Sequence, residues 1–281
     1  MTVPTVLREE RTGFVCLDRG YHGDTTGCMS VSGVDPFLRA FRPILFPARR
    51  VPAPYCYRCP VGKTYPECGV SCVDALGDAL REGGETVAAV ILEPLLLGAG
   101  GMIVYPPEYL SRAAALARTL GVHLILDEVA TGFGRTGTMF ACEQAGVSPD
   151  FLCLSKGLTG GTMPLAATLT TAEVYNSFLG GPDSGKTFHH GHTYTANPVG
   201  CAAALASLDL FEEEELVGER GEALLAPVAR GVVGREVAGR EARHEAERRA
   251  DVQAERIGAH GHTHADVAVA NRHRPVEVSA R

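Results

Sequence analysis

Two charged residues near the middle of the chain stand just after short apolar runs. Asp127 follows residues 122–126 (VHLIL), and Lys156 follows residues 151–154 (FLCL). Runs of this length are typical of buried parallel strands. In open α/β sheets, ligands bind at the carboxyl ends of the strands. We therefore expect a carboxylate and an amine to meet at one edge of a sheet.

This pair of groups suits pyridoxal phosphate (PLP), which carries an aldehyde and a cationic ring nitrogen. A lysine amine forms a Schiff base with the aldehyde, and an aspartate keeps the ring nitrogen protonated. The chain has three lysines, and only Lys156 directly follows an apolar run. The alternative is an ordinary ion pair between the two strand ends, and the bare pattern favours that alternative.

Longer motifs around both residues favour the cofactor interpretation. Residues 127–137 (DEVATGFGRTG) and 155–161 (SKGLTGG) closely resemble the signature of class III aminotransferases. Three further segments resemble blocks of this family in the same order: residues 21–25 (YHGDT), 93–101 (EPLLLGAGG) and 190–198 (HGHTYTANP). The resemblance implies PLP as the cofactor. Lys156 and Asp127 would both bind it and act in catalysis.

Within this family, the chain is most similar to the branch that serves biotin biosynthesis. The likeness is carried by residues 141–143 (ACE), 149–150 (PD), 165–171 (LAATLTT) and 201–207 (CAAALAS). It implies transfer of an amino group from S-adenosylmethionine to 8-amino-7-oxononanoate. The alternatives are another class III aminotransferase that acts on an ω-amine, and an inactive remnant that only folds or dimerises.

The same resemblance assigns the remaining site residues. Tyr21 is expected to line the pocket, together with Lys156, where an aromatic ring can lie against the flat cofactor and the substrate. His192 and Thr193 are expected to bind the cofactor of a neighbouring subunit, and Gly191 its substrate. A homodimer with shared active sites is therefore expected.

Three further charged residues have more than one interpretation. Glu93 ends an apolar run at Pro94, and its carboxylate is expected to pair with an arginine, to face the substrate, or to be solvated. Glu128 and Arg135 flank a glycine-rich turn, where a buried structural pair is favoured over catalysis.

Cysteine and histidine clusters raise the question of a metal. Cys56, Cys59, Cys68 and Cys72 have a spacing that could form a tetrahedral zinc site, but unliganded thiols are the default expectation. Histidines at positions 189, 190 and 192 are expected to be incidental or hydrogen-bonded rather than metal ligands. We predict no metal site.

The apolar pattern also predicts the elements that position these residues. Strands are expected over residues 11–18, 86–92, 122–126, 151–154 and 164–170, and helices over residues 71–82, 106–120 and 200–211. The segment that follows Gly23, up to about Pro54, is expected to loop across the surface. The fold class is α/β, with a mainly parallel sheet and helices on both faces. By resemblance this is the large domain of a fold-type I PLP-dependent transferase, with an antiparallel last strand.

Composition excludes several classes of function. The net charge of −7 provides no basic surface for nucleic acid, so we expect no nucleic-acid partner. No apolar run is long enough to span a membrane, and the first 14 residues contain no apolar signal core, so a cytoplasmic protein is expected. The nine cysteines are then expected to be reduced thiols or metal ligands rather than disulfides. The partners expected are a small-molecule amine donor and an oxo acceptor.

The resemblance covers roughly residues 12–211. We therefore expect an incomplete transferase domain over residues 1–211, with the small domain largely missing, and a chain that is cut at its start and shifted out of frame near its end. Residues 212–281 lack aromatic residues, and Arg, Glu, Ala, Val and His dominate them. We predict a mobile tail there, in which the histidines at 260, 262 and 264 reflect biased composition rather than a metal site.

Overall fold

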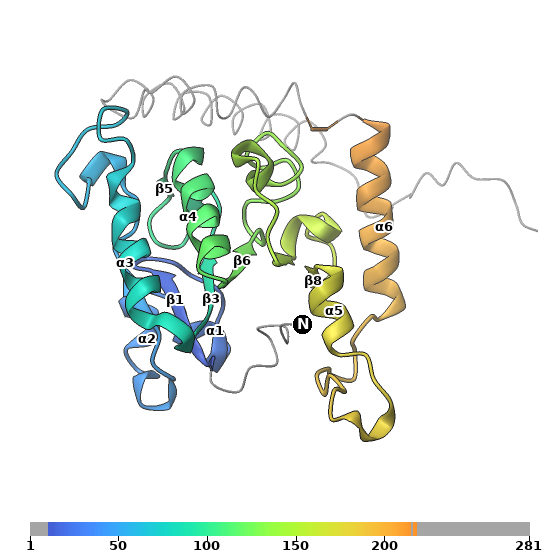
Figure 1. Cartoon of the computed structure of the whole chain (residues 1–281). Coiled ribbons are helices and arrows are strands. Elements are labelled where there is room, and N and C mark those ends of the chain that lie inside the picture. Colours follow the sequence, from blue (N-terminus) through green and yellow to red (C-terminus); the bar gives the residue numbers. More distant parts are fainter. Residues whose placement is uncertain (1–10, 215, 218–281) are drawn as a thin grey trace, which may run out of the picture. The chain divides into compact units, whose positions relative to one another are not determined.

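The computed structural model describes residues 11–214 and 216–217 of the 281-residue chain. Within these residues, a six-stranded sheet forms the centre of the fold (Figure 1). In spatial order its strands are β2 (Arg49–Val51), β1 (Gly13–Leu17), β3 (Val87–Leu92), β6 (His123–Asp127), β7 (Phe151–Leu154) and β8 (Ala167–Thr170). The first five run parallel, and β8 runs antiparallel to β7. The predicted α/β class with a mainly parallel sheet is confirmed, as is the direction of the last strand.

The segment from Gly23 to Pro54, which the sequence predicts to be a surface loop, contains α1 (Thr26–Ser30), α2 (Asp35–Leu38) and β2, so for these residues that prediction is wrong. The guanidinium of Arg50 donates to the carbonyl oxygens of Ser30 and Ser32, each at 2.8 Å, while only Val51 of this strand is buried. A three-residue edge strand with two arginines contains no apolar run, so periodicity could not reveal it.

One face of the sheet is covered by α3 (Asp74–Gly83) and α4 (Pro107–Thr119), which Figure 1 shows in front of β1 and β3. Side chains alternate between the two faces along each strand. Thus Leu92 and Leu126, which are neighbours in the register of β3 and β6, belong to the main core with α3 and α4. Ile91 points to the other face, into a smaller cluster that includes Val31.

Proline and glycine set the ends of α4. Pro107 occupies its first position, where a missing N–H costs nothing, and Gly121 follows it with a φ of +62°, a conformation that only glycine adopts readily. The strand β6 begins two residues later and ends at Asp127. This short connection places Asp127 at the carboxyl edge of the sheet.

The remaining helices are short, except for the last. They are α1 (Thr26–Ser30), α2 (Asp35–Leu38), α5 (Ala172–Ser177) and α6 (Pro198–Glu213). The side chain of Asn197 caps α6 by accepting a hydrogen bond from the N–H of Gly200 at 2.7 Å. The hydroxyl of Ser207 donates to the carbonyl of Gly157 at 3.3 Å, so α6 supports the turn that carries Lys156.

A small hairpin of β4 (Leu96–Leu97) and β5 (Ile103–Val104) follows β3. It encloses a glycine-containing turn at residues 98–101, beside the end of β3. None of the helices in the described part of the chain is long and apolar enough to cross a membrane. Of the predicted tail, residues 212 and 213 continue α6, and residues 218–281, with their histidine cluster, lie outside the described residues.

Candidate active site

A cavity of about 300 Å³ lies at the carboxyl edge of the sheet. Its walls are formed by Tyr21, His22, Gly23, Glu93, Ala99, Asp127, Val129, Ala130 and Lys156. These residues lie at or just beyond the ends of β1, β3, β6 and β7, because parallel strands all end at the same edge. Larger hollows of about 440 and 820 Å³ occur elsewhere, so the chemistry of the lining, and not the volume, identifies this cavity as the candidate site.

Lys156, one of the residues that line this cavity, is held in an unusual backbone conformation. Its φ is +44°, and such left-handed non-glycine residues cluster at functional sites. Close packing fixes the next position, since a Cβ at Gly157 would lie 2.7 Å from the Cβ of Phe133. Lys156 itself is exposed, so its amine is accessible to a ligand.

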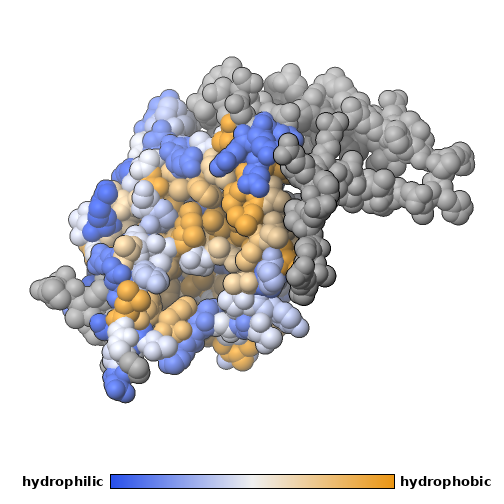
Figure 2. All heavy atoms as spheres, turned by 90° about the vertical axis from the view of Figure 1, so that its right-hand side faces the viewer, coloured by the Kyte–Doolittle hydropathy of each residue, from blue (hydrophilic) through white to orange (hydrophobic). Residues whose placement is uncertain are grey.

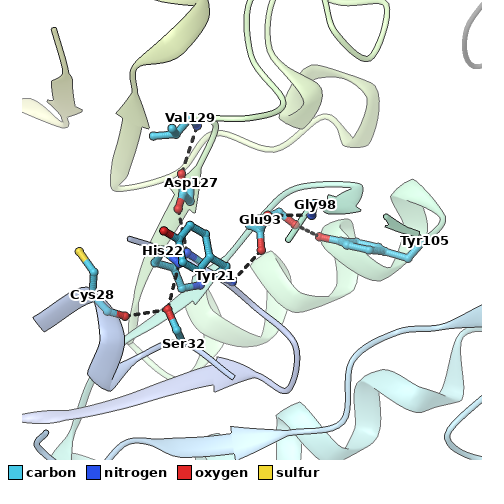
Figure 3. A network of polar contacts seen from close by, with 9 residues as sticks. All are labelled: Tyr21, His22, Cys28, Ser32, Glu93, Gly98, Tyr105, Asp127 and Val129. Atoms are coloured by element: carbon cyan, nitrogen blue, oxygen red, sulfur yellow. Dashed lines mark hydrogen bonds and ion pairs between the residues drawn. The ribbon is translucent and has the colours of Figure 1, made fainter. Parts of the chain in front are cut away.

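Asp127 is paired with His22 and not with Lys156, so the alternative of a simple ion pair between strand ends is wrong. The Nδ1 atom of His22 lies 2.8 Å from Oδ2 of Asp127, and the N–H of Val129 donates to Oδ1 at 3.1 Å (Figure 3). Only 8% of Asp127 is exposed. The carboxylate is therefore fixed from behind, and its remaining lone pairs can face the cavity.

His22 is a site residue that the sequence reasoning missed. Its side chain is 2% exposed, and its Nε2 atom has no hydrogen-bond partner among the described residues. The signal was present in the YHGDT segment, where His22 directly follows Tyr21. However, nothing in a single sequence links position 22 to position 127 until the sheet brings β1 and β6 to a common edge.

Glu93 links the loop that carries Tyr21 to the loop that carries Gly98. Its Oε1 accepts a hydrogen bond from the N–H of Tyr21 at 2.9 Å, and its Oε2 accepts one from the N–H of Gly98 at 3.0 Å. Burial raises the pKa of Glu93, and these two backbone N–H groups oppose that shift. No arginine pairs with it in the described part of the chain, so that interpretation is wrong, as is the solvated one, because only 4% of the residue is exposed.

Tyr21 lines the cavity and contacts a second aromatic ring. Its ring meets that of Phe37 edge to face, with centroids 5.6 Å apart. Burial raises the pKa of the Tyr21 hydroxyl, so this group is neutral near pH 7. Whether the ring lies against a cofactor remains a prediction.

The predicted pair between Glu128 and Arg135 is wrong. Glu128 is fully buried, accepts a hydrogen bond from the hydroxyl of Thr131, and accepts another from the N–H of Cys142 at 2.9 Å. Arg135 is exposed. The buried carboxylate is satisfied by its local turn and by a backbone amide, so it needs no cation.

Gly191, His192 and Thr193 do not line the Lys156 cavity. His192 instead lines a separate hollow of about 820 Å³, together with Ser155, Tyr194 and Asn197. Adjacent residues 155 and 156 thus line different hollows. The sequence assigned these three loop residues to a neighbouring subunit, and their absence from the lining of the cavity does not test that assignment.

The four clustered cysteines line a very small cavity of about 10 Å³ between residues 54 and 106. The pKa of Cys56 and that of Cys72 are raised from 9.0 to about 11, mainly by burial and to a lesser extent by the neighbouring thiols. Both are therefore protonated near pH 7. No three His, Cys, Asp or Glu side chains among the described residues are arranged to hold a metal ion.

Comparison with known proteins identifies the family. Residues 3–226 match the model of the class III aminotransferases. The chain belongs to the class III aminotransferase family. It is 52% identical, over 213 residues, to an adenosylmethionine-8-amino-7-oxononanoate aminotransferase of Geobacter sulfurreducens, covering 75% of this chain and 47% of the relative. A relative of the same name from Methanocaldococcus jannaschii is 46% identical over 225 residues, covering 75% of this chain and 49% of the relative.

Solved structures of aminotransferases show the same fold. The crystal structure of the Methanocaldococcus jannaschii enzyme matches with a TM-score of 0.68 at 44% identity, covering 75% of this chain and 46% of that one. A PLP-bound amine transaminase from an uncultivated Pseudomonas species matches with a TM-score of 0.70 at 39% identity, covering 74% and 47%. The chain thus spans about half the length of the relatives that it matches.

Class III aminotransferases are PLP-dependent, and the cavity has the groups that this cofactor requires. Asp127 offers a fixed, buried carboxylate for a protonated ring nitrogen, and Lys156 offers an exposed amine for an aldehyde. The space between them, about 300 Å³, suits a single substituted pyridine ring. The lining therefore fits the ring of the cofactor.

Proposed function

We propose that this chain contributes to PLP-dependent transamination, and that Lys156 and Asp127 are its catalytic residues. The single observation that carries the proposal is the cavity in which an exposed lysine in a strained turn faces a buried, histidine-paired aspartate. When bound, PLP supplies an aldehyde that carries the amino group and a ring that accepts electrons.

The residues have distinct parts in this proposal. Lys156 Nζ would hold the aldehyde of the cofactor, and its free amine would act as the base and acid that moves a proton at the reacting carbon. Asp127 holds a proton on the ring nitrogen, and the fixed contact with His22 keeps its carboxylate in place. Tyr21, which lines the cavity, would pack its ring against the cofactor and the substrate.

For the substrates, we propose S-adenosylmethionine as amino donor and 8-amino-7-oxononanoate as acceptor, in biotin biosynthesis. Support comes from the names of relatives that are 42–52% identical to this chain. The amine transaminase and ω-transaminase structures, each at 39% identity, favour a second candidate, which is transfer from a simple ω-amine.

We further propose a homodimer in which Gly191, His192 and Thr193 act on the partner's cavity. Support comes from the exposed apolar residues on and near α6 and the preceding loop, on the side that Figure 2 faces: Phe188, Tyr194, Val199, Leu205 and Leu210. A second copy would cover this surface and bring the loop to a cavity that it does not reach within one chain.

A cytoplasmic location and a domain over residues 1–211 are parts of the same proposal. The nine cysteines are all unpaired thiols, as is usual in a reducing compartment. The helices and strands of the described residues run from β1, which begins at Gly13, to α6, which ends at Glu213.

Titration of the purified chain with PLP tests the proposal. The wild-type chain should develop a visible absorbance band, and the Lys156→Ala variant should not. Lys186→Ala is the matched control, because Lys186 lies in an exposed loop and should leave the band unchanged. Absence of the band in the wild-type chain would favour an inactive remnant.

Single-turnover measurements then separate the two substrate candidates. The PLP-loaded chain is mixed with S-adenosylmethionine or with a simple ω-amine, and loss of the visible band is followed. The biotin proposal predicts faster loss with S-adenosylmethionine. Loss with the ω-amine alone would support the second candidate.

A further inference from the structure

Glu93 lines the cavity and directly follows β3. Each of its carboxylate oxygens accepts a hydrogen bond from a different loop (Figure 3). One donor is the N–H of Tyr21 and the other is the N–H of Gly98, 72 residues and 5 residues away in sequence. The carboxylate thereby links two separate loops.

The two loops are in close contact at Gly100 and Arg19. A Cβ at Gly100 would lie 2.1 Å from the carbonyl oxygen of Arg19, so the backbones of the two loops are in direct contact. The N–H of Gly33 donates to the carbonyl of Gly20 at 2.7 Å and holds the first loop from its other side. Such a loop can move only if several contacts break together.

The two lining residues of the first loop are each held through their backbone N–H. The N–H of Tyr21 is held by Glu93, and the N–H of His22 is held by the hydroxyl of Ser32 at 2.9 Å. The hydroxyl of Ser32 in turn donates to the carbonyl of Cys28 at 2.8 Å. The position of the Tyr21 ring, and of the imidazole that contacts Asp127, therefore depends on these side chains.

Glu93 is itself held firmly. The hydroxyl of Tyr105 donates to the main-chain carbonyl of Glu93 at 2.6 Å, and Tyr105 is fully buried. Both carboxylate oxygens accept hydrogen bonds from backbone N–H groups, which do not act as acids or bases in a reaction. This arrangement suits a residue that positions others rather than one that transfers a proton.

We propose that Glu93 is a positioning residue that sets the location of the Tyr21 ring over the cavity and, through His22, of the Asp127 carboxylate. This inference rests on the proposed function, because the groups that Glu93 positions are those assigned to PLP. It predicts that loss of the carboxylate changes how PLP is held without removing the lysine that binds it.

The test compares Glu93→Gln with Glu128→Gln. Both residues are buried glutamates that follow a strand end and accept a hydrogen bond from a backbone N–H, but Glu128 does not line the cavity. In the wild-type chain, each carboxylate oxygen of Glu93 accepts a hydrogen bond from a backbone N–H. In Glu93→Gln, the side-chain NH₂ replaces one of these oxygens and cannot accept, so one of the two hydrogen bonds is lost. We expect the PLP dissociation constant to rise by up to about tenfold, the equivalent of one weakened hydrogen bond between the displaced Asp127 carboxylate and the charged ring nitrogen.

Two further measurements distinguish positioning from general stability. Hydrogen exchange at the amides of Tyr21 and Gly98 should be faster in Glu93→Gln, and the visible circular dichroism of bound PLP should change, because the band depends on the rings around it. Glu128→Gln should lower the thermal midpoint and speed exchange at Cys142. It should leave the dichroism of bound PLP unchanged.

A milder variant covers the case in which Glu93→Gln does not fold. Tyr105→Phe removes only the hydroxyl that holds the Glu93 carbonyl, and it should change the dichroism in the same direction by a smaller amount. An unchanged dissociation constant and dichroism in either folded variant would overturn the inference while leaving the proposed function intact. A wild-type chain that binds no PLP would overturn both.

Discussion

The two hollows on either side of residues 155 and 156 are built in different ways. The Lys156 cavity is formed by strand ends and tight loops, and its polar groups are held by named contacts such as those of Asp127 and Glu93. The His192 hollow is formed mostly by exposed loop residues, and the contacts of His192 stay within its own loop. The first is prearranged by the fold, whereas the polar contacts of His192 do not connect the second hollow to the sheet.

The contrast separates two kinds of group in the proposed enzyme. Groups that must be held accurately for chemistry lie on the sheet edge, where packing fixes them. Groups proposed to reach a partner's cofactor lie on an exposed loop next to an apolar surface. The following predictions test whether the two hollows are halves of one site.

The largest effect is expected from Lys156→Ala. Loss of the amine removes both covalent binding of PLP and proton transfer, so turnover should fall by at least about a thousandfold, since proton transfer alone contributes roughly 10² to 10⁴. Steady-state assays measure the rate. Lys63→Ala is a control, because Lys63 contacts Ser71 far from this cavity, and an equal loss in that variant would contradict the assignment.

Asp127→Asn should have the next largest effect. The amide keeps the size of the carboxylate but cannot hold a proton on the ring nitrogen, and loss of one preorganised partner typically costs on the order of 10² to 10³ in rate. PLP should still react with Lys156. A variant with wild-type turnover would remove Asp127 from the mechanism.

Mixing two variants tests whether the loop that carries His192 and Thr193 serves another subunit. If Thr193 acts on the partner's cavity, a mixture of Lys156→Ala and Thr193→Ala chains forms dimers with one intact site. After random reassociation, activity should recover to about a quarter of the wild-type value. The same mixture should stay inactive if Thr193 and Lys156 of one chain form one site.

The smallest effect concerns the thiol cavity, which should be independent of both hollows. The pKa of Cys56 and Cys72 is raised from 9.0 to about 11, mainly by burial. A raised folded-state pKa gives stability that is fully present below pH 9 and is lost as the pH rises toward 11. Urea unfolding at pH 8 and at pH 10.5 should show this loss.

A double variant provides the comparison for this pH effect. Replacing both Cys56 and Cys72 with Ala should lower the stability at pH 8 but reduce its decline between pH 8 and pH 10.5. PLP binding should be the same in both chains, and treatment with a metal chelator should not change it. A decline that is unaffected by the substitutions would mean that other groups cause it.

Sequence reasoning predicted that Asp127 and Lys156 lie close together at one edge of the sheet, and both line the same cavity. The runs before Asp127 and Lys156 are apolar and short, so periodicity alone indicated the strands, and strand ends meet at one edge. It could not reach contacts between distant loops. The pairing of His22 with Asp127 and the link from Glu93 to Tyr21 span 105 and 72 residues, and only the order of the strands brings them together.

The errors have a similar physical cause. The sequence suggested that Glu128 pairs with Arg135 because opposite charges flank a turn, but the turn itself provides hydrogen bonds to the buried carboxylate. The edge strand β2 has two arginines in three residues, so nothing in its pattern distinguishes it from a loop. For Glu128, a backbone N–H satisfies the carboxylate, and for β2, pairing with β1 forms the strand. Neither interaction can be recognised from residue types alone.

The most direct test of the account is to locate the bond between the chain and PLP. The PLP-loaded chain is reduced with borohydride, digested and mapped by mass spectrometry, with Asp127→Asn treated in parallel. The account predicts the pyridoxyl group on Lys156 in both chains. A label on Lys63, on Lys186 or on no lysine would contradict it.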